Sequence, residues 1–480
     1  MNHRLCLSLA FVTAATMLAG CVSAPAPESA AQPWPPPQRA QTSLQSWQEL
    51  RARRPDLSRP LTLAELADIA LQNNPASRKA WNDARVAAAQ GEQARGYFLP
   101  TVTAVGSVTR QKVSSNTDQL DQDYLGYGPG LQLNYLIFNF GGGREAAVEQ
   151  ALQTVYAANY TFNSTLQGIL LAVQNAYFGL VSAQAGIAAA QAQLKDAQTA
   201  LEFAKIRRDH GVGRELDVLQ AQALADQAAF LLAGAEGAER NALAVLTQAL
   251  GLPADVAVKV AAPAQTLPAA VDAARLTQLI DAALARRPDI AALRARLKAS
   301  ESAIKVAGAP NWPSLYFNGH ALRDYNKVWT GQFVAEDDWN YGAGLSLQWT
   351  LFDGLQTRNA KRAAEAQSAA ARDQLQQAEL AASAAVWSGH QNYQTALKKF
   401  AASTALLTSA QAAYDLALDS YKAGLMNILD LLTAEAQLAL ARSQNIAARQ
   451  EAFTALANLA FASGTLDREN LEVPRADGKP

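Results

Sequence analysis

Apolar and polar residues alternate along two short segments that lie far apart in the chain. The apolar positions are Leu131, Leu133 and Tyr135 in one segment and Leu345, Leu347 and Trp349 in the other. A period of two is typical of a β-strand with one apolar and one polar face. Similar segments follow Pro100 and Pro313. The pattern therefore predicts four short strands, at about 101–109, 131–138, 314–322 and 341–350.

The segments that join these strands are polar and rich in Asp, Asn and Gly. They cover Arg110 to Gly126 and Arg323 to Asn340. Such a composition is typical of exposed loops. We therefore expect two long loops, one between each pair of strands.

After the corners at Gly141–Gly143 and Asp353–Gly354 the period becomes helical and stays so for roughly 65 residues, about 100 Å of helix. Large apolar residues alternate with small ones in heptads, as with Val173 and Leu180 against Ala176. This seam predicts closely packed helix pairs. Each long helix reaches a glycine turn and then returns. The expected helical hairpins cover about 144–250 and 355–462, with turns at Gly211, Gly213 and Gly424.

Landmark residues recur at one displacement along most of the chain. The pairs that differ by 213 positions are Pro75 and Pro288, Pro100 and Pro313, Gly211 and Gly424, Asp217 and Asp430, and Gly251 and Gly464. A tandem duplication explains the series. We place repeat 1 at 61–260, repeat 2 at 261–466 and a polar tail at 467–480.

Four strands with one apolar face match the pattern of a transmembrane β-barrel, but four strands cannot close one. Because an open edge in lipid leaves backbone groups unpaired, the chain should form a dimer with eight strands or a trimer with twelve. The alternative is a soluble antiparallel sheet packed beside a coiled coil.

The first residues form an export signal. Residues 1–20 have a short polar start and an apolar stretch, as in a secretory signal peptide. The segment Leu18 to Cys21 resembles the bacterial lipobox, which implies acylation of Cys21 and a membrane-anchored N-terminus. By resemblance to other bacterial lipoproteins, Val22 after the cysteine is compatible with export to the outer membrane. Residues 21–60 are expected to form a Pro-rich tether.

Composition excludes several classes of function. The 480 residues carry 41 Lys and Arg against 42 Asp and Glu, so no basic excess favours nucleic acid. The two cysteines, Cys6 and Cys21, leave no internal thiol pair, and His210, His320 and His390 each stand alone. No Gly-Lys-Ser/Thr follows the glycines at the first corner. We expect no metal, no cofactor and no enzymatic activity.

These motifs together resemble the TolC-like outer-membrane factors, in particular the lipidated branch that resembles OprM and the NodT-type proteins. The resemblance covers about Leu61 to Leu466. Its carriers are Leu61-Thr62-Leu63, Asn73-Asn74-Pro75, Arg286-Arg287-Pro288-Asp289-Ile290, the two Tyr-Gly strand starts at 127 and 341, and the two glycine turns with the following Asp217 and Asp430.

The resemblance implies a mixed α/β membrane protein, mostly α. It would be a homotrimer with a twelve-stranded barrel in outer-membrane lipid and a twelve-helix tunnel in the periplasm. Such trimers are passive exit ducts for small molecules. A periplasmic adaptor docks at the helical turns, and an inner-membrane transporter, here of the resistance-nodulation-division type, supplies the substrate. Type I protein secretion is the neighbouring alternative; a periplasmic coiled-coil adaptor lipoprotein and a surface-associated enzyme are the others.

In this family, acidic side chains can narrow the periplasmic end of the tunnel, and that position maps onto Asp430, with Asp217 as its repeat partner. Three such carboxylates around an axis would repel one another and attract cations. The alternative is helix capping, with Asn427 as N-cap and Asp430 in the first turn. Thr433 stands where a second aspartate can occur, which argues against a second acidic ring.

Aromatic residues flank the predicted strands. They are Tyr97, Tyr135, Trp312 and Trp349. Such residues form belts at membrane interfaces, or they pack in a core. The sequence leaves both interpretations open.

Overall fold

The computed structural model describes residues 57, 59–113, 122–261, 267–268, 276–329 and 333–466. All of these belong to one unit, Asp56–Pro480. The predicted leader, Cys21, nearly all of the tether and the tail lie outside the described residues. Acylation of Cys21 therefore stays a prediction.

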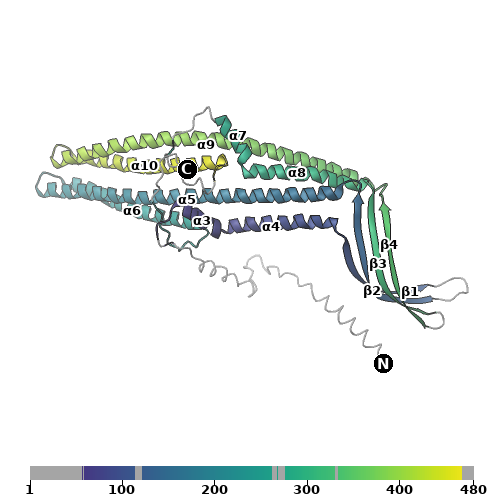
Figure 1. The fold of residues 1–480 in the computed structure, drawn as a ribbon. Helices are drawn as coiled ribbons and strands as arrows, with labels where there is room; N and C mark the ends of the chain where they lie inside the picture. The colour runs from purple at the N-terminus through teal and green to yellow at the C-terminus, as the bar shows by residue number, and fades with distance from the viewer. Residues whose placement is uncertain are drawn as a thin grey trace, which may run out of the picture. The chain divides into compact units, whose positions relative to one another are not determined.

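The elements appear twice in the same order (Figure 1). Repeat 1 contains α3 (Leu63–Asn73), α4 (Pro75–Arg95), β1 (Thr101–Val113), β2 (Gln122–Asn139), α5 (Gly143–Asp209) and α6 (Glu215–Ala249). Repeat 2 contains α7 (Leu276–Arg286), α8 (Pro288–Gly308), β3 (Ser314–Trp329), β4 (Phe333–Gln348), α9 (Gln356–Lys422) and α10 (Ile428–Ala462). Short 3₁₀ turns, η3 (Gly96–Phe98) and η5 (Ala309–Asn311), precede β1 and β3. The duplication and both hairpins are confirmed.

The long helices α5 and α9 run the length of the helical part and carry two sets of partners. Near the strands, α4 and α8 pack on α5, and α8 also packs on α9. Toward the turns, α6 and α10 pack on α5, and α10 also packs on α9. Each level therefore holds four helices, with α9 at one edge and α4 or α6 at the other.

The heptad seam is buried as predicted. Val173, Leu180 and Val386 are fully buried, and Tyr393 nearly so. Among the described helices, α5 alone is long and apolar enough to cross a membrane by composition. However, 44 % of its most apolar window is buried, and it contacts α4, α6, α8 and α10. Packing between helices explains its apolar character.

The period analysis did not predict the short helices α3, α4, α7 and α8. Their sequence signals are capping residues at the helix ends and not a long apolar period. The Thr62 hydroxyl accepts from the Glu65 amide, and the Glu65 carboxylate accepts from the Thr62 amide. The Asn74 side chain accepts from the Ala76 amide, and Pro75 follows at the first position of α4. The motif residues around Pro75 thus mark the ends of helices.

The four strands form one antiparallel sheet in the order β1-β2-β3-β4. Antiparallel partners lie on the same face of a sheet. Tyr135 lies opposite Phe317, which lies opposite Leu345. In the same way Leu133 lies opposite Gly319, which lies opposite Ala343. The apolar residues predicted from the two repeats therefore share one face, and Gln132, Asn134 and Ser346 lie on the other.

The predicted strand lengths were wrong. The strands have 13, 18, 16 and 16 residues, so most of Arg110–Gly126 and Arg323–Asn340 is strand and not loop. Polar residues lie on both faces there, which removed the alternation. Pairing across the strands holds these ends: the Tyr127 and Tyr325 rings stack at 5.4 Å, and Arg323 binds Asp337. At the other end β4 stops at Gln348, one residue before Trp349.

The two corners between sheet and helix use different caps. In repeat 1 the Asn139 carboxamide oxygen accepts from the amides of Gly141 and Gly143, each at 3.1 Å. The Arg144 guanidinium donates to the Leu136 carbonyl oxygen at 2.6 Å. In repeat 2 the Asp353 carboxylate accepts from the Thr357 amide at 2.7 Å. The glycines of the first corner therefore serve the backbone turn.

Gly251 ends α6 at φ 72°, where an added Cβ would lie 2.6 Å from the Asn74 Cα atom. We predict that Gly251→Ala destabilises the protein by about 2 kcal/mol or more, from left-handed strain and the clash. Gly237, inside α6, has open space, so Gly237→Ala should stabilise by about 0.5–1 kcal/mol. Thermal unfolding followed by circular dichroism compares the two. Equal melting temperatures for both variants would contradict the prediction.

Candidate gate and docking site at the helical tips

Each hairpin turns on a glycine in the left-handed region. Gly211 has φ 74° and Gly424 has φ 78°, a conformation that side chains other than glycine rarely adopt. Gly213 is needed for space, because an added Cβ would lie 2.8 Å from the Arg208 amide nitrogen. All three predicted turn residues are confirmed as turns; their role in docking is not tested by the geometry.

The two aspartates that follow the turns differ. Asp217 accepts from the Arg214 amide at 3.3 Å, and its carboxylate lies 3.0 Å from the Arg214 guanidinium, with 15 % of the side chain exposed. The Asp430 amide donates to the Asn427 side chain at 3.0 Å, so the predicted N-cap is confirmed. The Asp430 carboxylate is exposed and forms no ion pair with any described residue. Of the pair, Asp430 is thus the carboxylate available for a gate.

Asp430 shares a groove with the position where a second aspartate can occur. The groove lies between α9 and α10 and is lined by Asp430, Thr433 and Gln437 with alanines on both helices. Both candidate ring positions therefore face the same side of the hairpin. The first position, Asp430, carries a carboxylate, and the second, Thr433, carries a hydroxyl.

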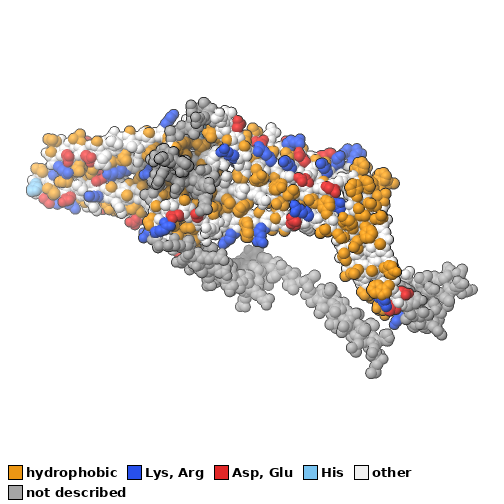
Figure 2. All heavy atoms as spheres, in the orientation of Figure 1, with side chains coloured by type: hydrophobic (Ala, Val, Ile, Leu, Met, Phe, Trp, Pro, Cys, Tyr) orange, Lys and Arg blue, Asp and Glu red, His pale blue; other side chains and the backbone are white. Residues whose placement is uncertain are grey.

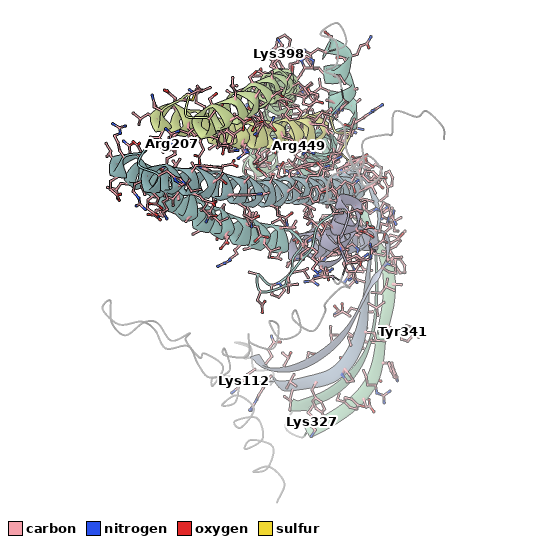
Figure 3. All side chains as sticks on the ribbon, turned by 90° about the vertical axis from the view of Figure 1, so that its left-hand side faces the viewer. Lys112, Arg207, Lys327, Tyr341, Lys398 and Arg449 are labelled. Atoms are coloured by element: carbon pink, nitrogen blue, oxygen red, sulfur yellow. The ribbon has the colours of Figure 1, made fainter. Side chains whose placement is uncertain are left out.

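Two cation–aromatic contacts connect α5 to α9 near the tips. The Arg207 guanidinium donates to the Tyr421 carbonyl oxygen at 2.9 Å and lies 4.9 Å from the centre of the Tyr421 ring. The Lys422 ammonium lies 5.2 Å from the centre of the Phe203 ring. Figure 3 shows Arg207 at the free end of the helices. Sequence reasoning missed this link, since its two sides come from different repeats and a period analysis treats each repeat by itself.

Apolar side chains surround both turns and point to solvent. Val212 and Leu425 are 67 % and 84 % exposed, and Leu216 and Leu429 are more than half exposed. Each pair differs by 213 positions, so the patch is duplicated like the turn. Exposed apolar patches of this kind mark interaction sites. Figure 2 shows hydrophobic atoms among the charges at this end.

A partly buried polar cluster lies between α5, α9 and α10. The Arg442 guanidinium lies 2.8 Å from the Asp196 carboxylate and 3.1 Å from the Gln411 carboxamide oxygen. Beside them Glu435 is 2 % exposed, and neither of its carboxylate oxygens has a hydrogen-bond partner. The buried Tyr414 hydroxyl is also unpaired. Burial raises the pKa of Glu435 to about 7; Asp196 adds to the increase and Arg442 opposes it.

The strand residues predicted to face lipid are exposed or half-buried in the single chain. Leu131, Leu345, Leu347 and Trp349 are each more than half exposed, and Leu133 and Tyr135 are half-buried. Tyr97 and Trp312 are also more than half exposed, which favours the interfacial belt over the core. Among the described residues no group of three or more His, Cys, Asp or Glu side chains could hold a metal ion.

A sequence model described as outer membrane efflux protein matches residues 66–252 and 279–465, once in each repeat. The chain belongs to the outer membrane efflux protein family. The resemblance drawn from the motifs is thereby confirmed. It places the sheet in the outer membrane, the helices in the periplasm, and the chain among efflux outer-membrane channels.

Individual relatives extend over much of the chain. Protein CyaE of Bordetella pertussis is 29 % identical over 415 residues, 86 % of each chain. The pyoverdine export outer membrane protein OpmQ of Pseudomonas aeruginosa is 26 % identical over 354 residues, 70 % of this chain and 72 % of OpmQ. The alkaline protease secretion protein AprF of the same species is 25 % identical over 424 residues, 85 % of each chain.

The fold also matches solved channels. The outer membrane protein VceC of Vibrio cholerae superimposes with a TM-score of 0.73 at 23 % identity, covering 84 % of this chain and 96 % of VceC. The predicted fold of each chain, four strands with long helical hairpins, is thus confirmed.

We predict that stability falls as pH rises past the pKa of Glu435. The folded state holds the Glu435 proton more tightly than the unfolded state does. Its contribution is therefore complete below about pH 4.5 and lost as pH rises through about 7. Glu435→Gln should remove about 1.3 kcal/mol of the loss in stability between pH 6 and pH 8. Melting temperatures at the two pH values give the readout.

Glu451, an exposed glutamate on the same helix paired with Lys399 at 2.8 Å, supplies the control. Glu451→Gln should keep the pH dependence of the wild type. If Glu435→Gln and wild type lose the same stability with pH, the buried carboxyl is not the group responsible.

Proposed function

We propose that this protein is the passive exit duct of a tripartite pump, a homotrimer that exports small molecules delivered from the periplasmic side. The observation that carries the proposal is the pair of open edges on the four-stranded sheet. Within the part of the chain that the structure describes, β1 pairs only with β2, and β4 only with β3. In lipid such edges cost several kcal/mol for each unpaired backbone group, so copies must pair β4 with β1.

A trimer fits the geometry of a closed duct better than a dimer does. Three sheets of four strands give twelve, and the four helices at each level give a matching ring of twelve. The edge helices carry the apolar surface that such contacts need: Phe230 on α6 and Leu380 and Trp387 on α9 are each more than half exposed. Two copies would give eight strands, whose interior is filled by side chains and leaves no duct.

The exposed apolar turns are the surface to which a periplasmic adaptor would dock. Val212 and Leu216 on one hairpin and Leu425 and Leu429 on the other would form alternating patches around the trimer. An inner-membrane transporter, of the resistance-nodulation-division type, would feed the assembly. We further propose that acylated Cys21 anchors the N-terminus in the outer membrane.

The motif at 286–290 supports this assignment only through its likeness to the family, because its residues are structural. The Arg287 guanidinium lies 2.7 Å from the Asp289 carboxylate and donates to the Ala462 carbonyl oxygen at 3.3 Å. It ties the start of α8 to the end of α10. No contact with a transporter follows from it.

Type I protein secretion is the second candidate. It is favoured by the match to AprF, whose name assigns it to protease secretion and which covers 85 % of this chain. Efflux is favoured by the match to OpmQ and by the family model. The duct geometry serves both, since the transporter chooses the substrate.

The first test is the native mass of the protein extracted from outer membranes in mild detergent. We expect a trimer, followed by drug accumulation in a deletion strain and its reversal when the gene is restored. A stable monomer would overturn the duct. A trimer with normal drug accumulation but lost protein export would select secretion.

We predict that Asp430→Ala weakens block of the channel by divalent cations at least about tenfold and raises conductance, because the exposed ring of carboxylates is removed. Planar bilayer recordings measure both. Asp217→Ala is the matched control: its carboxylate is held by Arg214, so cation block should stay near the wild-type value. Unchanged block in Asp430→Ala would rule out an acidic gate at this position.

A further inference from the structure

Basic residues gather on the strand ends that lie farthest from the helices. They are Arg110 and Lys112 on β1 and Arg323 and Lys327 on β3. Arg110 lies opposite Leu125 on β2, and Leu125 lies opposite Lys327. Lys112 is one row farther out, and Arg323 lies opposite Trp339. Figure 3 shows Lys112 and Lys327 at this end of the sheet.

All four lie on the face that carries the apolar residues. Positions on one strand that differ by an even number share a face. Lys327 and Arg323 are thus on the face of Ala321, which lies opposite Leu131. By the same count Arg110 and Lys112 share the face of Ala104, which also lies opposite Leu131. Within the described strands, no Lys or Arg occupies the opposite face.

The basic residues begin where the apolar band ends. On β4 and just beyond it, Trp349, Leu347, Leu345, Tyr341 and Trp339 share the apolar face. Trp349 to Trp339 is about 33 Å of extended chain, or about 25 Å of membrane at the usual tilt of barrel strands. The exposed Trp339 and Tyr341 therefore mark the far interface, and Lys327, Arg110 and Lys112 follow it.

Acidic residues lie on both faces of these strand ends, whereas the basic residues lie on the apolar face. Asp324 lies directly across from Asp338 on the other face. The apolar face also carries acidic residues, because Asp337 lies opposite Tyr325 and Asp123 lies opposite Lys112 in the register. On the apolar side Arg323 is held between the rings of Tyr325 and Trp339, at 5.7 Å and 5.2 Å, and lies 2.5 Å from Asp337. Lys327 is exposed beside it.

We propose that Arg110, Lys112, Arg323 and Lys327 form a binding surface for the phosphate groups of outer-leaflet lipids. The inference rests on the outer-membrane location of the sheet and not on the pump function. A lysine or arginine just beyond an aromatic belt extends its charge to the headgroups while its stem stays on apolar surface. Guanidinium and ammonium groups are the partners that phosphate prefers.

The test measures retention of lipid A by the purified full-length protein. Protein reconstituted in phosphatidylcholine vesicles with a minor fraction of bisphosphorylated lipid A is extracted, and bound lipid is counted by native mass spectrometry. We expect the double variant Lys112→Gln/Lys327→Gln to retain about fivefold less lipid A than wild type. Dephosphorylated lipid A should be retained weakly by both proteins. Lys112→Arg/Lys327→Arg should restore retention.

The control is Lys298→Gln/Lys305→Gln, which removes two exposed lysines from α8 in the periplasmic part. It should retain lipid A like wild type. Equal retention by wild type and the strand double variant would overturn the proposal, as would an equal loss for dephosphorylated lipid A. Displacement of lipid A by inorganic phosphate at equal concentration would also overturn it, because the surface would then recognise free anions.

Discussion

The hydrogen-bonding demand of backbone groups in lipid is the constraint on which the rest of this structure depends. A sheet of four strands leaves one side of β1 and one side of β4 without partners. Water can satisfy such groups but hydrocarbon cannot, so other copies of the chain must complete the sheet. The arrangement of the strands also fixes the starts of the long helices, because each helix follows a strand through a tight corner. At these corners Asn139 and Asp353 accept hydrogen bonds from the first amides of α5 and α9. A ring of strands thus imposes a ring of helices.

Duplication explains the shared scaffold of the two repeats, and divergence between them explains their different polar contacts. The long helices have 67 residues in both repeats, and both turns require glycine. At equivalent positions Asp217 is neutralised by Arg214 while Asp430 is free and exposed. The Arg207–Tyr421 contact likewise joins the two hairpins, and the residues at the equivalent positions, Ser420 and Arg208, are of other types. A trimer of this chain would therefore have two kinds of hairpin, one held and one able to present charge.

Charged side chains occupy defined places in both the sheet and the helical seam. At the far strand ends the basic residues lie on the apolar face, and acidic residues lie on both faces, with Asp337 bound to Arg323. In the helices, Glu435 is buried and Asp196 and Arg442 are half-buried in an otherwise apolar seam between α5, α9 and α10. A buried charge is stable only when paired, which explains why Arg442 binds Asp196 and Gln411 while Glu435 favours its neutral form. We therefore expect the stability of the seam to depend on pH although its packing is mostly alanine and leucine.

The sequence by itself determined the periodic features: the two hairpins, the duplicated seam of Val173 and Val386, the glycine turns and the apolar face of the sheet. These are local, because a period of two or of three and a half is written into neighbouring residues. It underestimated the strands, since polar residues on both faces beyond the membrane erase the alternation that a period analysis needs. Only the tertiary structure decided the contacts between distant residues, such as Arg442 with Asp196 and Arg207 with Tyr421. It also decided which aspartate is free, because that depends on the side chain of a neighbour in space and not on the residue type, which the two repeats share.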